Sequence, residues 1–293
     1  MTHALPDGQS DSSGGEMLAA VVVDLGRTIT DRRGPALSDE PDAVHQLRTS
    51  IRRMRNLLAA FASCFEPEPA EKFAVVLAAY GGLLGECRDL EVRAADALAV
   101  LADTGLEAAL HGSVVAPLLA DHDRAHAALV AWHGAGAAQS LDALLTHWSA
   151  APPLTRRADL PAVDVGAKAV RRQVRRVLDR ADRRAGADAE KIEEAVHALR
   201  RAARRLRHTA DAVEEVDGLE GAARVGDLGQ RIQGLLGDHR DAVLLADHVR
   251  GCAADEADRT SYDRVIGRAE ALADEAMAGL PPALSDLRAV AVP

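Results

Sequence analysis

Cysteine and aromatic residues are scarce in this 293-residue chain, and each scarcity argues against a class of structure. The three cysteines, Cys64, Cys87 and Cys252, are far apart and form no CxxC pair, which argues against a disulfide framework and a zinc site and indicates a reducing compartment. Aromatic residues make up 2% of the chain and apolar residues 48%, so the core must consist of many small contacts. This composition favours packed helices.

Long hydrophobic runs are also missing. The apolar run at residues 18–23 is too short to span a bilayer, and the N-terminal sequence lacks the basic start and apolar core of a secretion signal. We therefore expect a cytoplasmic protein that does not enter a membrane, with a disordered N-terminus over residues 1–14.

Lysine occurs at only three positions, so nearly all the positive charge is arginine. The net charge of -10 would disfavour a polyanionic partner if it were spread evenly. Residues 156–207, however, hold 16 basic and 8 acidic residues. The acidic average therefore conceals a basic segment.

The helical period of the apolar residues predicts an all-α protein without strands. The expected helices cover residues 16–32, 41–64, 69–103, 106–133, 138–149, 162–185, 189–216, 220–250 and 256–278. A break at APPLT, residues 151–155, divides the chain into near-equal halves.

The two halves are a tandem repeat. AVHQLRTSIRRMR at residues 43–55 returns as AVHALRRAARRLR at 195–207, and GLLGECRDL at 82–90 returns as GLLGDHRDA at 234–242, both at an offset of 152. We expect one domain over residues 15–280, made of repeats 15–150 and 156–280, and a C-terminal tail over 281–293. Two independent bundles on a flexible APPLT hinge are the alternative.

The repeated helix carries a basic stripe beside an apolar face. At about 100° per residue, the stripe is about 80° wide. It contains no acidic residue that would relieve repulsion between the arginines, so we expect an external anion to do so. The members of the stripe are His45, Arg48, Arg52 and Arg55 in the first copy and His197, Arg200, Arg204 and Arg207 in the second.

Further basic residues extend this candidate site. Beside a phosphate the pKa of both stripe histidines would rise above its usual value near 6.5. Arg88 and Arg240 are each followed by an aspartate, Asp89 and Asp241, so they either line the site or brace the fold. A third basic element, residues 168–184, supplies Arg171, Arg172, Arg175 and Arg176.

The candidate ligand is a polyanion, since the arginine fork suits phosphate. Single-strand binders stack bases on aromatic residues, and none of the seven aromatic residues interleaves with an arginine stripe, so a ligand without bases fits better. Duplex binding through backbone contacts stays open. No RHG motif, phosphate-binding GxxxxGK[ST] loop or carboxylate cluster for Mg²⁺ is present, so we expect no enzyme activity and no cofactor.

One further motif has the spacing of metal ligands. His122 and His126 stand at i, i+4 in DHDRAH. The segment lacks the Glu of HExxH and reads as an exposed polar stretch, so we expect no metal site.

The paired VHxLR helices, each followed by an LLGxxRD segment, resemble the CHAD family, the conserved histidine α-helical domain, from about residue 16 to residue 280. The resemblance implies two four-helix bundles related by pseudo-twofold symmetry, with basic helices lining a groove or pore that binds inorganic polyphosphate. It implies a stand-alone, non-catalytic protein, because the ExExK motif of the frequent CYTH partner domain is missing. It also implies association with polyphosphate granules or control of polyphosphate availability.

Two alternatives to this function are binding of a nucleic-acid backbone and a phosphohydrolase or phosphotransferase that uses the paired histidines. The resemblance gives as ligand-binding positions His45, Arg48, Arg52, Arg53, Arg55, His197, Arg200, Arg204, Arg205 and Arg207.

Overall fold

The computed structural model describes residues 12–134, 136–253 and 259–290. Within these ranges the chain forms helices and no strand, apart from two isolated backbone bridges that join Ser13 to Pro161 and Phe65 to Leu154. The predicted all-α class is therefore confirmed.

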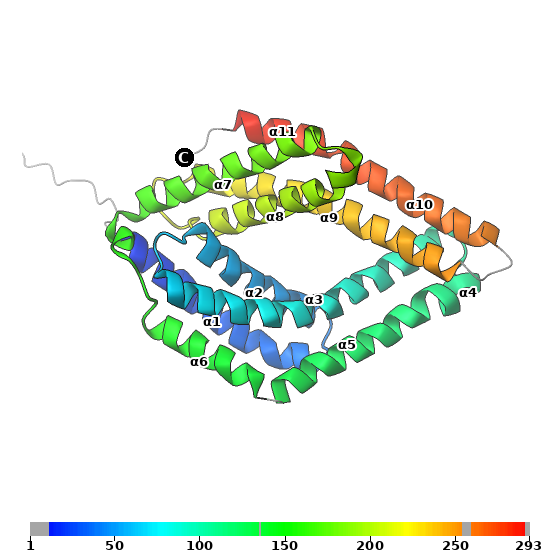
Figure 1. The fold of residues 1–293 in the computed structure, drawn as a ribbon, viewed down its shortest axis with the longest axis horizontal. Coiled ribbons are helices and arrows are strands. Elements are labelled where there is room, and N and C mark those ends of the chain that lie inside the picture. The colour runs from blue at the N-terminus through cyan, green and yellow to red at the C-terminus, as the bar shows by residue number, and fades with distance from the viewer. Residues whose placement is uncertain (1–11, 135, 254–258, 291–293) are drawn as a thin grey trace, which may run out of the picture.

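The helices fall into two groups, which Figure 1 shows as the lower and upper halves of the molecule. The first group consists of α1 (Gly14–Leu37), α2 (Ala43–Ala60), α3 (Pro67–Thr104), α4 (Glu107–Leu110), the π-helical turn η1 (His111–Val115), α5 (Ala116–Gly134) and α6 (Ala137–Ala150). The second consists of the 3-10 turn η2 (Arg156–Asp159), α7 (Ala162–Ala185), the 3-10 turn η3 (Ala189–Lys191), α8 (Ile192–Asp211), α9 (Gly221–Cys252), α10 (Arg259–Ala278) and α11 (Leu280–Ala289). The pseudo-twofold relation between four-helix bundles stays a prediction.

Local sequence explains several helix ends. Ser13 caps α1 through a reciprocal capping box with Glu16, and α3 ends at Gly105, which adopts the left-handed conformation with φ of 68°. Residues 1–11 of the expected disordered N-terminus lie outside the described residues. The expected boundary at residue 14 is wrong, because the Ser12 carbonyl accepts a hydrogen bond from the Ala162 amide and the helix begins at Gly14.

The expected C-terminal tail is helical over Leu280–Ala289. Two prolines at residues 281 and 282 suggest a helix stop, but they occupy the first turn of α11, where proline is favoured because its missing N–H needs no partner. Leu280 and Leu287 are buried in the core. Residues 281–289 therefore belong to the folded domain, and residues 291–293 of the expected tail lie outside the described residues.

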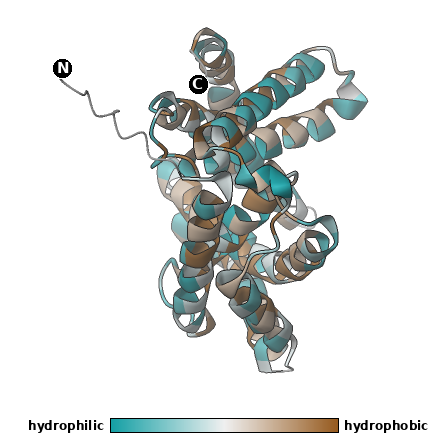
Figure 2. Ribbon diagram, turned by 90° about the vertical axis from the view of Figure 1, so that its left-hand side faces the viewer, coloured by the Kyte–Doolittle hydropathy of each residue, from teal (hydrophilic) through white to brown (hydrophobic). Residues whose placement is uncertain are grey.

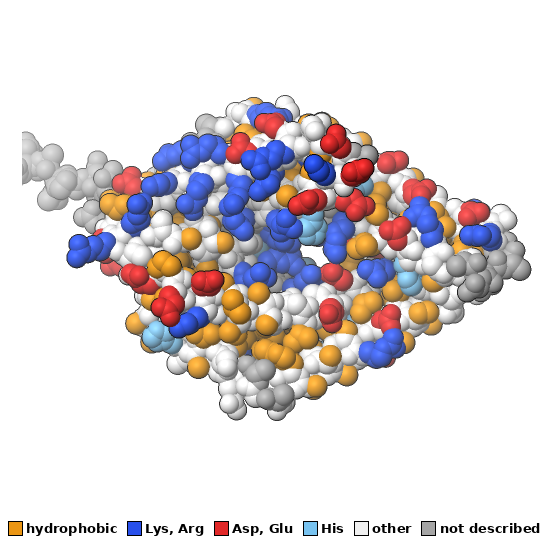
Figure 3. Space-filling view, in the orientation of Figure 1, with side chains coloured by type: hydrophobic (Ala, Val, Ile, Leu, Met, Phe, Trp, Pro, Cys, Tyr) orange, Lys and Arg blue, Asp and Glu red, His pale blue; other side chains and the backbone are white. Residues whose placement is uncertain are grey.

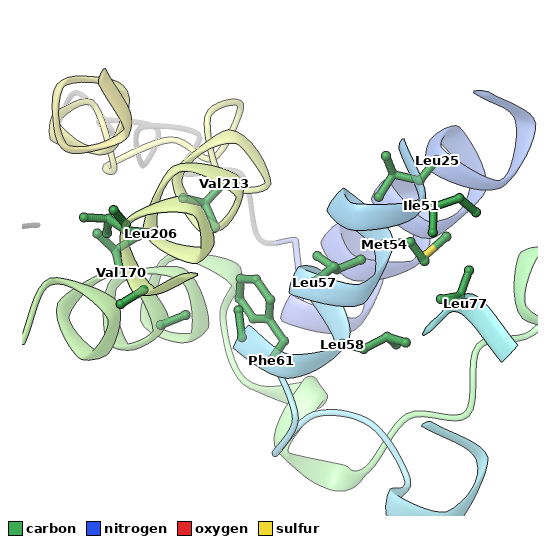
Figure 4. Close-up of a cluster of buried hydrophobic side chains, with 14 of the residues drawn as sticks. Leu25, Ile51, Met54, Leu57, Leu58, Phe61, Leu77, Val170, Leu206 and Val213 are labelled. Atoms are coloured by element: carbon green, nitrogen blue, oxygen red, sulfur yellow. The ribbon is translucent and has the colours of Figure 1, made fainter. Parts of the chain in front are cut away.

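The amphipathic helices bury one face each, and Figure 2 shows hydrophobic and hydrophilic residues alternating along them. A single cluster of buried side chains draws on both halves of the chain. In Figure 4, Phe61, which follows the last residue of α2, lies between Val170 and Leu206 of the second half and Leu58 of the first. Burial of a side chain of this size contributes about 2–3 kcal/mol.

The APPLT segment is held against the end of α2 and is not a free hinge. The Thr155 amide donates to the Cys64 carbonyl at 2.9 Å, and the Glu66 amide donates to the Pro153 carbonyl at 2.9 Å. Together with the shared core, these bonds argue against two independent bundles.

A second buried cluster joins the two halves at the far end of the long helices. It combines Leu101 of α3 and Val115 of η1 with Leu245 of α9 and Tyr262 of α10. The halves are thus joined at both ends, and the polar faces of α2, α3, α8 and α9 approach one another between these contacts.

Candidate anion-binding site

Helices α2 and α8 meet at equivalent positions of the repeat. The side-chain amide of Asn56 lies 2.8 Å from Nδ1 of His208, and these two residues are 152 positions apart. This contact brings the two basic stripes onto the same region of the molecule. Figure 3 shows Lys and Arg side chains gathered over α7 and α8 and around a hollow in the middle of the face.

Four arginines from the two stripes lie close enough to act on one another, and we define Arg48, Arg52, Arg200 and Arg204 as the central arginine cluster. Burial, together with the neighbouring cations Arg204 and Arg48, lowers the pKa of Arg52 to about 9. Burial, together with the cations Arg200 and Arg48, likewise lowers the pKa of Arg204 to about 10. Both groups stay cationic at neutral pH.

Arg52 and Arg204 are surrounded mainly by other cations. Among the described residues neither forms an ion pair, and Nε of Arg204 is buried without a hydrogen-bond partner. Charged groups buried without compensation are costly. An anion placed between α2 and α8 would remove this cost.

The side chain of Arg48 packs against α3 and that of Arg200 packs against α9, each at a glycine of the repeated GLLG segment. A Cβ atom added to Gly85 would lie 3.3 Å from Nη2 of Arg48, and one added to Gly237 would lie 3.3 Å from Nη2 of Arg200. The last glycine of each GLLG segment therefore leaves room for the guanidinium group of the preceding stripe.

Asp89 braces the cluster. Its two carboxylate oxygens accept from Arg48 at 2.8 Å and from Arg240 at 3.5 Å, so it joins α3 to α2 and to α9. Burial alone would raise the pKa of Asp89, but the two arginines outweigh burial and lower it. Arg240 also lies 3.7 Å from Asp241. The sequence left open whether Arg240 lines the site or braces the fold, and these contacts give it a bracing role.

Arg88 does not pair with Asp89, the carboxylate that follows it in the sequence. Its Nη1 donates to Glu91 at 3.0 Å, whereas Asp89 serves Arg48 and Arg240. The positive charge of Arg88 nevertheless acts on His45.

The two stripe histidines lie among arginines. Burial lowers the pKa of His45, which is half-buried, and Arg88 lowers it further. Burial and then Arg201 lower the pKa of the exposed His197. Both imidazoles are therefore neutral near pH 7 until an anion offsets the surrounding positive charge.

A second group flanks the first, the lateral arginine cluster, which we define as Arg55, Arg172, Arg176, Arg201 and Arg205. Burial lowers the pKa of Arg205, and the other four cations lower it further. Arg172 of α7 donates to the Ala60 carbonyl at the end of α2. Arg201 was missed by the sequence analysis because it lies outside the stripe; the repeated RR pairs at residues 200–201 and 204–205 were the available clue.

The remaining predicted residues lie elsewhere. Arg171 and Arg175 are exposed on α7. Arg53 lies 3.4 Å from Asp211 and lines a cavity of about 940 Å³ with it. Burial raises the pKa of Asp211, while Arg53 and Arg207 act in the opposite direction. Arg53 and Arg207 thus group with this carboxylate.

No helix in the described part of the chain is both long and apolar enough to cross a membrane.

Sequence comparison identifies the family. The CHAD domain model matches residues 26–250. The chain is 30% identical over 228 residues to the uncharacterized proteins MT2285 and Rv2226 of Mycobacterium tuberculosis, strains CDC 1551 / Oshkosh and ATCC 25618 / H37Rv. These matches cover 72% of this chain and 40% of each relative, so the chain spans well under half the length of the curated relatives it matches.

Two solved structures share the fold. PptA from Streptomyces chartreusis superposes with a TM-score of 0.72 at 20% identity, covering 94% of this chain and 100% of that chain. The CHAD domain from the plant Ricinus communis superposes with a TM-score of 0.73 at 22% identity, covering 100% of this chain and 96% of that chain. The family model and the shared fold confirm the resemblance noted in the sequence, and the chain belongs to the CHAD domain family.

Proposed function

We propose that this chain binds inorganic polyphosphate without catalysing its turnover, along the central and lateral arginine clusters. The observation that carries the proposal is the pair Arg52 and Arg204, two half-buried arginines that form no ion pair with a carboxylate among the described residues. A linear polyanion supplies closely spaced phosphate oxygens, which can engage several arginines from both halves through charge-assisted hydrogen bonds.

The placement of the aromatic residues supports a ligand without bases. Phe61, Phe65, Phe73, Tyr80 and Trp148 are all at most 2% exposed. Tyr262 is 4% exposed, and Trp132 stacks on Tyr80. No aromatic side chain is therefore offered to a nucleotide base beside the arginines, and a single-stranded nucleic acid would lack its usual stacking contacts.

The surroundings of the histidines support binding rather than phosphoryl transfer. Among the described residues, neither His45 nor His197 donates to a carboxylate that would hold one ring nitrogen ready to attack phosphorus. Phosphoryl transfer also relies on positioned groups and metal ions that stabilise the transferred phosphoryl group. We assign the histidines to electrostatic contact with bound phosphate.

A chain that captures polyphosphate reversibly would associate with polyphosphate granules in the cytoplasm or control how much polyphosphate is available. Counterion release should make its affinity fall steeply with salt concentration.

Calorimetric titration with long-chain polyphosphate, beside oligodeoxythymidylate of matched charge, tests the proposal. The double variant Arg52→Gln/Arg204→Gln removes the two unpaired cations. The matched control Arg27→Gln/Arg124→Gln removes two cations that form exposed i, i+3 ion pairs.

We expect the control to bind like the wild type. The double variant should lose about 3 kcal/mol or more, roughly 100-fold in affinity, because charge-assisted hydrogen bonds contribute about 1.5–3 kcal/mol each. Tighter binding of the oligonucleotide would favour a nucleic-acid binder. Release of orthophosphate in proportion to protein would favour an enzyme.

A further inference from the structure

Three metal-ligating side chains converge beside the basic region from three separate elements. Asp39 lies in the turn between α1 and α2, Glu91 in α3 and His122 in α5. Nε2 of His122 lies 3.4 Å from Oε1 of Glu91 and 3.8 Å from Oδ1 of Asp39. One ligand atom from each of the three side chains lies within 4.8 Å of the other two.

The imidazole of His122 points into this cluster without a hydrogen-bond partner. Its side chain is 12% exposed, and its Nε2 atom is buried with no hydrogen-bond partner in the described part of the structure. The expectation from the sequence that this segment is an exposed polar stretch is therefore wrong at His122. A buried nitrogen of this kind requires either a proton shared with the carboxylates or a bound cation.

His126 is not the second ligand that the i, i+4 spacing suggests. Its Nε2 lies 3.0 Å from the Ala36 carbonyl, which occupies that nitrogen. The ring lies nearly parallel to that of His122 at a centroid distance of 6.2 Å.

We propose that Asp39, Glu91 and His122 bind one divalent transition-metal ion of the Zn²⁺ or Mn²⁺ class. One imidazole nitrogen and two carboxylate oxygens are borderline and hard donors, a set that suits these ions better than Mg²⁺ or Ca²⁺, which prefer oxygen alone. Bond lengths of about 2.0–2.2 Å need ligand atoms roughly 3–4 Å apart, so only small side-chain rotations are required. Water would complete the coordination.

The surroundings of Glu91 are those of an oriented metal ligand. Its second oxygen, Oε2, accepts a hydrogen bond from Arg88 at 3.0 Å, which leaves Oε1 directed at His122. Such outer contacts fix the geometry of ligating carboxylates. The metal ion would tie the α1–α2 turn, just before His45, to α3 and α5.

Within the described residues, a cluster of this kind occurs in the first half of the chain and not in the second. At the 152-residue offset of the repeat, Asp39 corresponds to Lys191 and Glu91 to Val243. The proposal therefore predicts one such ion per chain. It does not depend on polyphosphate binding, because the metal is titrated in the absence of phosphate.

The test is a calorimetric titration of the tag-free, phosphate-free protein with Zn²⁺, followed by Co²⁺ absorption spectroscopy. The variants Asp39→Asn and Glu91→Gln each replace one ligand by its isosteric amide, and asparagine tolerates the left-handed conformation at residue 39, where φ is 52°. Glu86→Gln is the matched control, an exposed carboxylate on the same helix as Glu91. Circular dichroism establishes that each variant is folded.

We expect one Zn²⁺ per wild-type chain, the same affinity in Glu86→Gln, and more than about tenfold weaker binding in both ligand variants. The Co²⁺ complex should show no thiolate charge-transfer band. Three results would overturn the proposal: no saturable binding, equal binding by all variants, or a thiolate band, which would place the ion at Cys252 and His248, whose Sγ and Nε2 atoms are 3.7 Å apart.

Discussion

Arg52 and Arg48 lie one helical turn apart on α2, and we predict opposite effects on stability when each is replaced by methionine. Arg52→Met removes a half-buried cation that forms no ion pair with a carboxylate among the described residues. The pKa of Arg52 is lowered from 12.5 to about 9, and each pKa unit corresponds to about 1.4 kcal/mol, which sets an upper limit of roughly 5 kcal/mol. Screening inside a solvated hollow reduces this, and we expect a gain of about 1–2 kcal/mol.

Arg48→Met should act in the opposite direction. It removes the cation 2.8 Å from Asp89 and leaves this carboxylate only the longer contact with Arg240 at 3.5 Å. The Arg48 and Asp89 side chains are 21% and 34% exposed, so water offsets part of the loss, and we expect a cost of about 1–3 kcal/mol.

Urea unfolding at low salt, with and without polyphosphate, measures both effects. Polyphosphate at 100 times its dissociation constant should stabilise the wild type by about 2.7 kcal/mol and Arg52→Met by less. The reasoning is refuted if Arg52→Met destabilises the free protein as much as Arg48→Met does, since Arg52 would then be a structural residue.

Three further predictions concern other parts of the molecule. Burial, together with nearby arginines, lowers the pKa of His208 to about 2, so below pH 6.5 the unfolded chain binds more protons than the folded protein. The free energy of unfolding of the wild type should therefore fall by about 1 kcal/mol for each pH unit below pH 6.5. Urea unfolding at several pH values should show a smaller fall in His208→Gln. Gly229→Ala places a Cβ 3.1 Å from backbone atoms of α8 and should lower the melting temperature, whereas Gly234→Ala, which meets open space, should raise it. The pKa values of His45 and His197 are lowered in the free protein, and bound phosphate would raise them. Polyphosphate affinity should therefore increase as the pH falls from about 8 to about 6. Calorimetry should show a smaller increase in the double variant His45→Gln/His197→Gln.

The faces of the helices could be predicted from the sequence because helical periodicity is local. Leu47, Ile51 and Met54 of the first copy and Leu199 and Leu206 of the second all follow the predicted apolar face and are at most 1% exposed. The helix over residues 162–185 has the predicted bounds.

Contacts between distant elements could not be predicted in the same way. Asp89 follows Arg88 in the sequence, yet it pairs with Arg48 and Arg240, which lie 41 and 151 positions away. The metal-ligating cluster likewise depends on the turn at Asp39 reaching α3 and α5. Periodicity specifies which side of a helix faces inward, but the partner across an interface depends on how the helices cross.

The predicted stripe residues do not all lie in one arginine cluster. Arg53 and Arg207 group with Asp211, although the resemblance placed both among the ligand-binding positions. Arg201 enters the lateral cluster from outside the stripe. The angular position of an arginine on an isolated helix does not show which carboxylates of the neighbouring helices lie beside it. These carboxylates determine which arginines are neutralised.

The most direct test of the account is a crystal structure of the chain with a polyphosphate of defined length. The account predicts phosphate groups in the hollow between α2 and α8, within hydrogen-bonding distance of both Arg52 and Arg204, with Arg48 still bound to Asp89. Phosphate bound only to the exposed arginines of α7, with the hollow empty, would contradict it.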